Sequence, residues 1–142
     1  QRDLPQRRAM IDIEIDWDRY PHFERHEFVC KCGCDLAPMS TGILRRLEVL
    51  RHECGGNPLP IASGFRCNKS NRKIGGGPAH PTGRAVDIRA AGELARKIVV
   101  YSHSFNGLGV SQTGPHDERF IHLDTLGHDE FDSTPRPWIW SY

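Results

Sequence analysis

The segment that decides the fold and the chemistry is GGGPAHPTGRAVDIRA, residues 75–90. His80 follows a run of glycines and lies among turn-forming residues, which predicts that it sits in a loop. Asp87 lies in AVDI, an apolar run between two arginines, which predicts a β-strand. A histidine from a loop and an aspartate from a strand, brought together by folding, form a pair that suits a metal ion.

The composition describes one globular domain. A chain of 142 residues is long enough for a single hydrophobic core, and its 37% hydrophobic and 26% charged residues exclude the disordered and membrane classes. No apolar run approaches the roughly 20 residues of a membrane-spanning helix. The 19 basic and 18 acidic residues are interspersed, so the basic face of a nucleic-acid binder is absent. We therefore expect neither a nucleic acid nor a membrane as partner.

The chain is expected to consist of an N-terminal arm, residues 1–21, and a single domain, residues 22–142. The arm contains MIDIEIDW, whose alternation predicts extended chain or an edge strand. Either Ser40 or Thr41 can cap a helix that ends at the pair Gly55–Gly56. The other expected elements are a cysteine-rich loop over 22–35, strands over 59–67, 84–90, 108–111 and 119–124, a polar glycine-rich loop over 68–78, a helix over 92–103 and an aromatic tail from 136. This order predicts an α+β domain, in which helices pack on one face of a small, mainly antiparallel sheet.

A third ligand is available in RFIHLD, residues 119–124. Alternation along a strand there directs Phe120, His122 and Asp124 to one face of the sheet. A histidine and a carboxylate then share the face that can meet Asp87. Catalytic zinc sites commonly use three such ligands and keep a fourth position open for water.

These residues resemble a known family. HPTGRAVD matches the H-x-x-G-x-A-x-D core of the zinc D-alanyl-D-alanine carboxypeptidases and related peptidoglycan endopeptidases, the M15-like peptidases of the hedgehog/DD-peptidase fold. IHLD resembles their second-histidine strand, and ASGFRCNKSNRKIGGGPAH resembles their S-G-[YF]-R segment with its asparagine- and glycine-rich loop. FERHEFVCKCGC is similar to the cysteine-rich opening of one branch, often phage-encoded. The resemblance runs from about Phe23 to the tryptophan-containing tail, and four motifs in the right order make it specific.

The resemblance implies a site with one zinc ion. Its ligands would be His80, Asp87 and His122, and Arg66 would hold the scissile carbonyl oxygen and the oxyanion formed from it. One departure is Pro78, which stands where the family usually has a serine that can form a hydrogen bond to substrate.

The general base does not follow from the family pattern. Relatives place an acid or a histidine two or three residues before the second zinc histidine, where this chain has Phe120 and Arg119. Asp124 is the favoured base, and its rival role is to orient a ligand imidazole. The other candidates for the base are His116, Asp117 and Glu118 in the preceding loop.

The resemblance implies a zinc metallopeptidase that hydrolyses D-amino-acid-containing stem peptides or cross-links of bacterial peptidoglycan. The alternative is an inactive zinc-containing module of the same fold that binds the cell wall or forms part of a virion. The charged amino terminus shows no signal peptide, although a mature chain can have lost one. We expect action on the cell wall, either in the periplasm or, if the protein is phage-encoded, as an endolysin released at lysis or a virion component. A monomer is the expected oligomeric state.

The five cysteines are an odd number, which excludes a complete disulfide framework and favours synthesis in a reducing compartment. The motif C-x-C-x-C in an extended chain directs three thiols roughly the same way. Two interpretations remain open: a second, structural four-thiolate site, or buried free thiols with at most one disulfide. The candidate ligands of the second site are Cys30, Cys32, Cys34 and Cys67, and Cys54 is an alternative fourth thiol.

Overall fold

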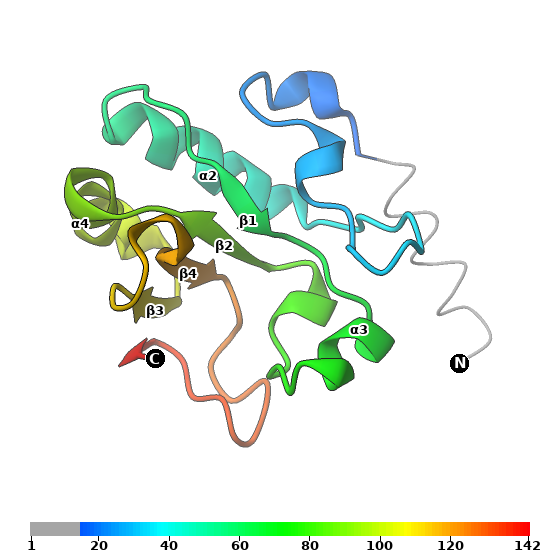
Figure 1. Cartoon of the computed structure of the whole chain (residues 1–142). Helices are drawn as coiled ribbons and strands as arrows, with labels where there is room; N and C mark the ends of the chain where they lie inside the picture. The colour runs from blue at the N-terminus through cyan, green and yellow to red at the C-terminus, as the bar shows by residue number, and fades with distance from the viewer. Residues whose placement is uncertain (1–14) are drawn as a thin grey trace.

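The structure is a computed structural model of the chain, of which residues 15–142 are described (Figure 1). Most of the expected extended arm lies outside these residues, and its described part contains a short 3-10 helix, η1 (Trp17–Arg19). Ile15 and Tyr20 from the arm are buried in the same core as the rest of the chain. None of the helices in the described part is long and apolar enough to cross a membrane.

The domain is built on one five-stranded sheet, and the predicted α+β fold class is confirmed. The strand order is β1-β2-β4-β3-β5, and all pairs are antiparallel except β3 with β5. The aromatic segment expected as a tail forms the parallel edge strand β5, which the sequence analysis missed. The strands are β1 (Ile61–Ser63), β2 (Ala85–Arg89), β3 (Gly107–Ser111), β4 (Phe120–Asp124) and β5 (Trp138–Ser141). The helices are α2 (Thr41–Glu53), α3 (Asn68–Lys73) and α4 (Gly92–Tyr101), with short 3-10 helices η2 (Arg25–Glu27), η3 (His80–Thr82), η4 (Ser102–Ser104) and η5 (His116–Glu118).

Helix α2 forms where the apolar periodicity predicts it. The Ser40 hydroxyl accepts a hydrogen bond from the backbone N–H of Ile43 at 3.3 Å, which satisfies one of the free donors of the first turn. The helix ends before Gly55, whose φ of +100° is a conformation that favours glycine. Its apolar face enters the core through Ile43, Leu44, Leu47 and Leu50.

Helix α3 lies in the segment that was expected to be a polar loop, so that prediction was wrong. The helix has only six residues and buries one of them, Asn71, so its sequence carries no apolar periodicity. Its N-cap is Cys67, whose sulfur accepts a hydrogen bond from the backbone N–H of Ser70.

The two faces of the sheet have different roles. On β4, Ile121 and Leu123 are fully buried in the core shared with α2 and α4, whereas Phe120, His122 and Asp124 alternate with them toward the opposite face. Figure 1 shows α2 and α4 on one side of the sheet, and α3 with the C-terminal segment toward the other. The hydrophobic core therefore supports one face, and the polar side chains of the other face are free to form a site.

Candidate metal centre and cleft

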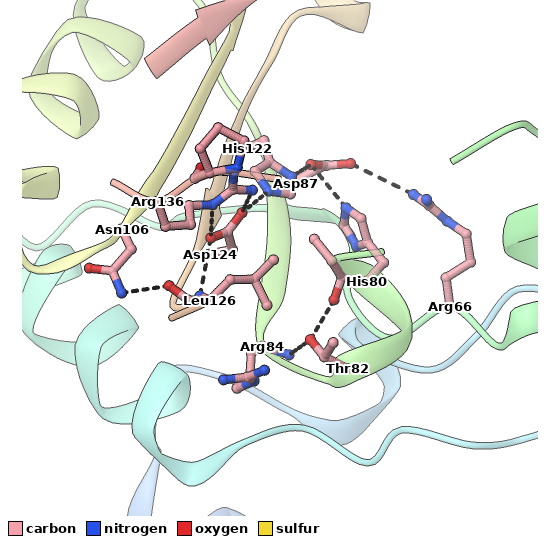
Figure 2. Close-up of polar contacts among 12 residues, drawn as sticks. Arg66, His80, Thr82, Arg84, Asp87, Asn106, His122, Asp124, Leu126 and Arg136 are labelled. Atoms are coloured by element: carbon pink, nitrogen blue, oxygen red, sulfur yellow. Dashed lines mark hydrogen bonds and ion pairs between the residues drawn. The ribbon is translucent and has the colours of Figure 1, made fainter. Parts of the chain in front are cut away.

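Pairing between β2 and β4 brings two of the predicted metal ligands side by side. Asp87 is the register partner of His122, and Asp87 Oδ1 lies 3.0 Å from His122 Nδ1. His80, at the start of η3, completes the group, with its Nε2 3.4 Å from the same carboxylate oxygen (Figure 2). One ligand atom from each residue lies within 4.8 Å of the others. The structure thus brings together the three residues that the sequence singles out.

Each imidazole is held by a hydrogen-bond acceptor on the side away from this group. His80 Nδ1 donates to the carbonyl oxygen of Gly64 at 2.8 Å, because a carbonyl can only accept. His122 Nε2 lies 2.7 Å from the Asp124 carboxylate. Such outer partners select the tautomer and orientation of metal-binding histidines. The nitrogens that face Asp87 are therefore oriented so that they could bind a metal ion.

The donor set fits a divalent metal ion such as zinc. Two imidazole nitrogens and one carboxylate oxygen, all nearly buried, are the donor types that a three-residue catalytic zinc site with one open position uses. Water or substrate can take the open position, since the three ligands line a cleft.

The charges around the group hold the carboxylate ionised. Burial by itself would raise the pKa of Asp87, but hydrogen bonds from His122 and His80 outweigh it and hold that pKa well below its usual range. Burial by itself would lower the pKa of His122, but the carboxylates of Asp124 and Asp87 on its two sides raise it. A metal ion would therefore compete with a proton for His122 Nδ1.

Asp124 is fully buried and its carboxylate accepts four hydrogen bonds. Its Oδ1 accepts from Arg136 Nε at 2.9 Å and from the backbone N–H of Leu126 at 3.2 Å. Its Oδ2 accepts from Arg136 Nη2 and from His122 Nε2, both at 2.7 Å. Burial would raise the pKa of Asp124, but the contacts with His122 and Arg136 lower it to about 2. Because a carboxylate has about four acceptor positions, these contacts favour the orienting role for Asp124 over that of general base.

Glycine at 107 makes room for this carboxylate. Gly107 on β3 is the register partner of Asp124, and a Cβ atom there would lie only 2.3–2.5 Å from its carboxylate atoms. Arg136 comes from the segment after β4, and sequence reasoning missed it because nothing local marks a partner twelve residues away. The aromatic residues that follow Arg136 are the sequence feature that could have drawn attention to this segment.

The other candidates for the base lie elsewhere. His116, Asp117 and Glu118 form η5, and all three side chains are exposed. None of them lines the cleft. Within residues 15–142, Asp87 is the only carboxylate residue among those that line it.

Arg66 is held beside the candidate metal ligands by a network that includes α3. Its Nη1 donates to Asn71 Oδ1 and its Nη2 to Ser63 Oγ, both at 3.0 Å, and Nη2 lies 3.8 Å from Asp87 Oδ2. The Asn71 amide in turn donates to the carbonyl oxygens of Gly76 and Gly77 at 3.2 and 2.8 Å. The guanidinium is therefore fixed at the cleft, as an oxyanion donor must be. Sequence reasoning missed Asn71, because the helix that presents it was not expected.

The cleft has a volume of about 560 Å³ and an aromatic wall. The wall comes from β5 and the residue after it, through Trp138, Trp140 and Tyr142. The Trp140 ring lies 5.2 Å from the His122 ring, and the Arg136 guanidinium carbon lies 5.0 Å from the Trp140 centroid. The segment expected as an aromatic tail thus lines the cleft through Trp138, Trp140 and Tyr142.

The rest of the cleft is formed by the glycine-rich segment and by the residues around Arg136. Pro78 is part of this wall and has no side-chain hydrogen-bond donor where a serine was expected. Ile74 is exposed at the margin. The cleft therefore combines charged groups at the ligands with apolar surface around them. Its lining residues are Arg66, Ile74–Ala79, His80, Asp87, Phe120, His122, Ser133–Arg136, Trp138, Trp140 and Tyr142.

The remaining predicted group is the cysteine cluster, whose sulfur atoms also lie together. Cys30, Cys32, Cys34 and Cys67 each place a sulfur within 4.8 Å of the others. Cys54, the alternative fourth thiol, is not in this group and is buried at the end of α2. None of the four lines the cleft.

Comparison with known families agrees with the geometry. Residues 21–124 match the family described as Peptidase M15, a span that holds the three metal-ligand candidates and Arg66. The site and the fold define a metallopeptidase-type domain, in a family whose peptidases are metal-dependent. The chain belongs to the Peptidase M15 family, which confirms the resemblance seen in its motifs. A search of curated proteins returns no match.

Proposed function

We propose that the protein is a zinc-dependent peptidase that hydrolyses peptide bonds of bacterial peptidoglycan, in stem peptides or cross-links that contain D-amino acids. The observation that carries this proposal is the group of His80, Asp87 and His122 at the cleft, with each imidazole turned toward Asp87 by an outer acceptor. Family membership supports a peptide substrate. The cell-wall substrate rests on the motif resemblance, and the aromatic wall offers apolar contacts for peptide side chains.

The mechanism assigns separate roles to the residues of the cleft. His80, Asp87 and His122 would hold the zinc ion, which supplies Lewis-acid chemistry that polarises a carbonyl and makes water nucleophilic at neutral pH. Arg66 donates hydrogen bonds to the carbonyl oxygen as negative charge grows on it during attack. The contacts to Ser63 and Asn71 hold the guanidinium in place before substrate binds.

Asp124 acts in this proposal by orienting His122. Its four accepted hydrogen bonds hold the imidazole with Nδ1 toward Asp87 and leave no lone pair for a proton of the attacking water. The assignment of Asp124 as general base, and those of His116, Asp117 and Glu118, stay predictions.

A second candidate function is a zinc-containing module that binds cell-wall peptide without cutting it. The observation that favours it is the absence, among the described lining residues, of any carboxylate besides the ligand Asp87. General acid–base catalysis needs a group within hydrogen-bond reach of the proton that it takes. As a peptidase or as a binding module, the protein would act at the cell wall, as a bacterial enzyme or as an endolysin or virion component of a phage.

The test is release of soluble peptides from purified peptidoglycan, measured by mass spectrometry with metal analysis of every sample. Wild type and His52→Ala, which changes an exposed histidine on α2, should bind zinc and release peptides. His122→Ala should lose the zinc of the cleft and the activity together. Zinc bound in the cleft of wild type without any peptide release would refute the peptidase and leave the binding module.

A further inference from the structure

Four cysteine sulfurs meet where the N-terminal part of the domain contacts the start of α3. Three of the cysteines, Cys30, Cys32 and Cys34, lie in one short loop. The fourth, Cys67, directly follows Arg66 in the sequence. The Cys30 and Cys32 sulfurs are 3.5 Å apart, and those of Cys32 and Cys67 are 3.6 Å apart. In Figure 1 the cyan loop lies beside the green segment that connects β1 to α3.

These separations match those around a single tetrahedral ion. With zinc–sulfur distances of about 2.3 Å, the edge of a tetrahedron of four sulfurs is about 3.8 Å. The two measured separations lie just below this edge, and no pair exceeds 4.8 Å. A cluster of several iron atoms and bridging sulfides would hold its cysteines farther apart, so a single ion fits better.

The loop is bent in a way that lets three closely spaced cysteines face one point. Residues 31–34 form a turn in place of the extended chain expected from C-x-C-x-C, so that detail of the prediction was wrong. Gly33 has a φ of +92°, which permits the turn at no steric cost. The chain therefore curls around the position where the sulfurs converge.

Backbone donors point at the sulfurs, as they do at metal-bound thiolates. The N–H of Cys67 donates to Cys30 Sγ at 3.3 Å, and the N–H of Ser70 donates to Cys67 Sγ at 3.4 Å. A hydrogen bond to the charged form of a group stabilises that form. These contacts lower the cost of holding several thiolates together.

We propose that Cys30, Cys32, Cys34 and Cys67 bind a structural zinc ion that fixes the N-terminal loop against the segment carrying Arg66. Each cysteine binds as a thiolate and releases its thiol proton to solvent, and the ion offsets two of the four negative charges. No oxidation or reduction takes place. The site is separate from the zinc ion of the cleft and does not depend on the proposed peptidase activity.

The position of the site explains what it would stabilise. Cys67 caps α3, and α3 presents Asn71, which holds the Arg66 guanidinium. On the other side, the N–H of Phe65 donates to the carbonyl of Phe28 at 2.9 Å, and Lys31 Nζ donates to the carbonyl of Ala62. An ion bound by the cysteines would add a direct link between the N-terminal loop and the segment that carries Arg66. The loop would then hold that segment in a fixed position.

The competing interpretation is a set of free thiols with at most one disulfide. A disulfide needs a sulfur separation of about 2.05 Å and would use only two of four converging sulfurs. Cys32 and Cys34 are exposed, so they are not the buried free thiols that fill a core. Four thiols at one point, two of them exposed, are better explained by a shared ion.

The experiment counts zinc in the purified full-length chain, prepared under reducing conditions and dialysed free of loosely bound metal. Wild type should hold two zinc ions per chain, and His80→Ala/His122→Ala should keep one. Cys32→Ser/Cys34→Ser should also hold one. Because both positions are exposed, the substitutions remove no buried packing, and the lost zinc reports on the thiols. Cys54→Ala removes the buried thiol outside the cluster and should hold two.

Two further readouts separate the cysteine site from the cleft. With cobalt in place of zinc, the His80→Ala/His122→Ala variant should show sulfur-to-cobalt charge-transfer absorption. The quadruple variant, which also carries Cys32→Ser/Cys34→Ser, should not show it. Trypsin should cut after Lys31 faster in the cysteine variant than in wild type, because the loop is no longer held.

The proposal is refuted if His80→Ala/His122→Ala binds no zinc or binds iron instead. It is refuted as well if a sample of this variant purified without reductant shows an intact mass two units below that of the reduced chain, which indicates a disulfide. It is also refuted if Cys32→Ser/Cys34→Ser holds as much zinc as wild type. Loss of peptide release alone, with both zinc ions bound, would refute only the peptidase.

Discussion

Replacing Asp124 by asparagine tests whether this carboxylate orients His122 or acts as a general base. The substitution keeps the shape of the side chain but removes its charge and replaces one acceptor oxygen by a donor amide. That amide must face one of the groups that now donate to Asp124, which are Arg136, His122 and the N–H of Leu126. One or more donors thereby lose their acceptor.

The expected cost has two parts. The Arg136 side chain is 6% exposed, and breaking a buried ion pair by removing one partner costs about 3–5 kcal/mol of the free energy of unfolding. Loss of the outer partner of a metal-binding histidine lowers metal affinity by about 10–100-fold. Loss of a general base would instead leave zinc affinity unchanged and lower turnover by about 10²–10⁴-fold.

The assays are urea unfolding of the metal-free protein and zinc titration against a competing chelator, each on wild type, Asp124→Asn and Asp124→Asn/Arg136→Met. The double variant removes the unpaired charge and should recover part of the lost free energy of unfolding, but not the zinc affinity. Unchanged zinc affinity in Asp124→Asn with a large loss of turnover would refute the orienting role and favour the base. A change in unfolding free energy below about 1 kcal/mol would refute the buried-pair argument.

Three other predictions follow from the contacts around the cleft. Gly107→Ala should lower the free energy of unfolding by about 1–3 kcal/mol and weaken zinc binding, because the added Cβ overlaps the Asp124 carboxylate. Urea unfolding measures the free energy of unfolding, and a value equal to that of wild type would contradict the overlap. Arg66→Lys should keep the zinc of the cleft but lower kcat by about 10²–10³-fold, because an ammonium group cannot reach the oxyanion with the fixed geometry of the guanidinium. Peptide release at saturating substrate measures kcat, and an unchanged value would exclude the oxyanion role of Arg66. The zinc affinity of the cleft should fall as the pH falls through the pKa of His122, which is raised above the usual histidine value of about 6.5. The reason is that the proton favoured by Asp124 and Asp87 must leave before the metal binds. Calorimetry in buffers of different ionisation enthalpy measures the proton released, and a zinc affinity that is constant down to pH 6 would contradict the prediction.

Much of the fold follows from local patterns in the sequence. The apolar spacing of α2 and its serine cap predict that helix closely, and alternation predicts β4 with His122 and Asp124 on one face. Helix α3 could not be predicted, because six residues with one buried side chain leave no periodic signal. Strand β5 could not be predicted either, because it pairs in parallel with β3 and its residues are mostly exposed.

The sequence by itself determined the chemistry that the protein can use: the ligand types at 80, 87 and 122, the arginine at 66, and the candidate thiol ligands of the C-x-C-x-C motif and Cys67. These follow from residue identity and short-range spacing, which local physical chemistry is able to read. Only the tertiary structure decided which nitrogen of each histidine faces the metal position, that Arg136 and His122 together fill the acceptor positions of Asp124, and that Cys67 meets the cysteine loop 37 residues away from Cys30. Those relations depend on strand register and on packing between distant segments, and no local pattern encodes them.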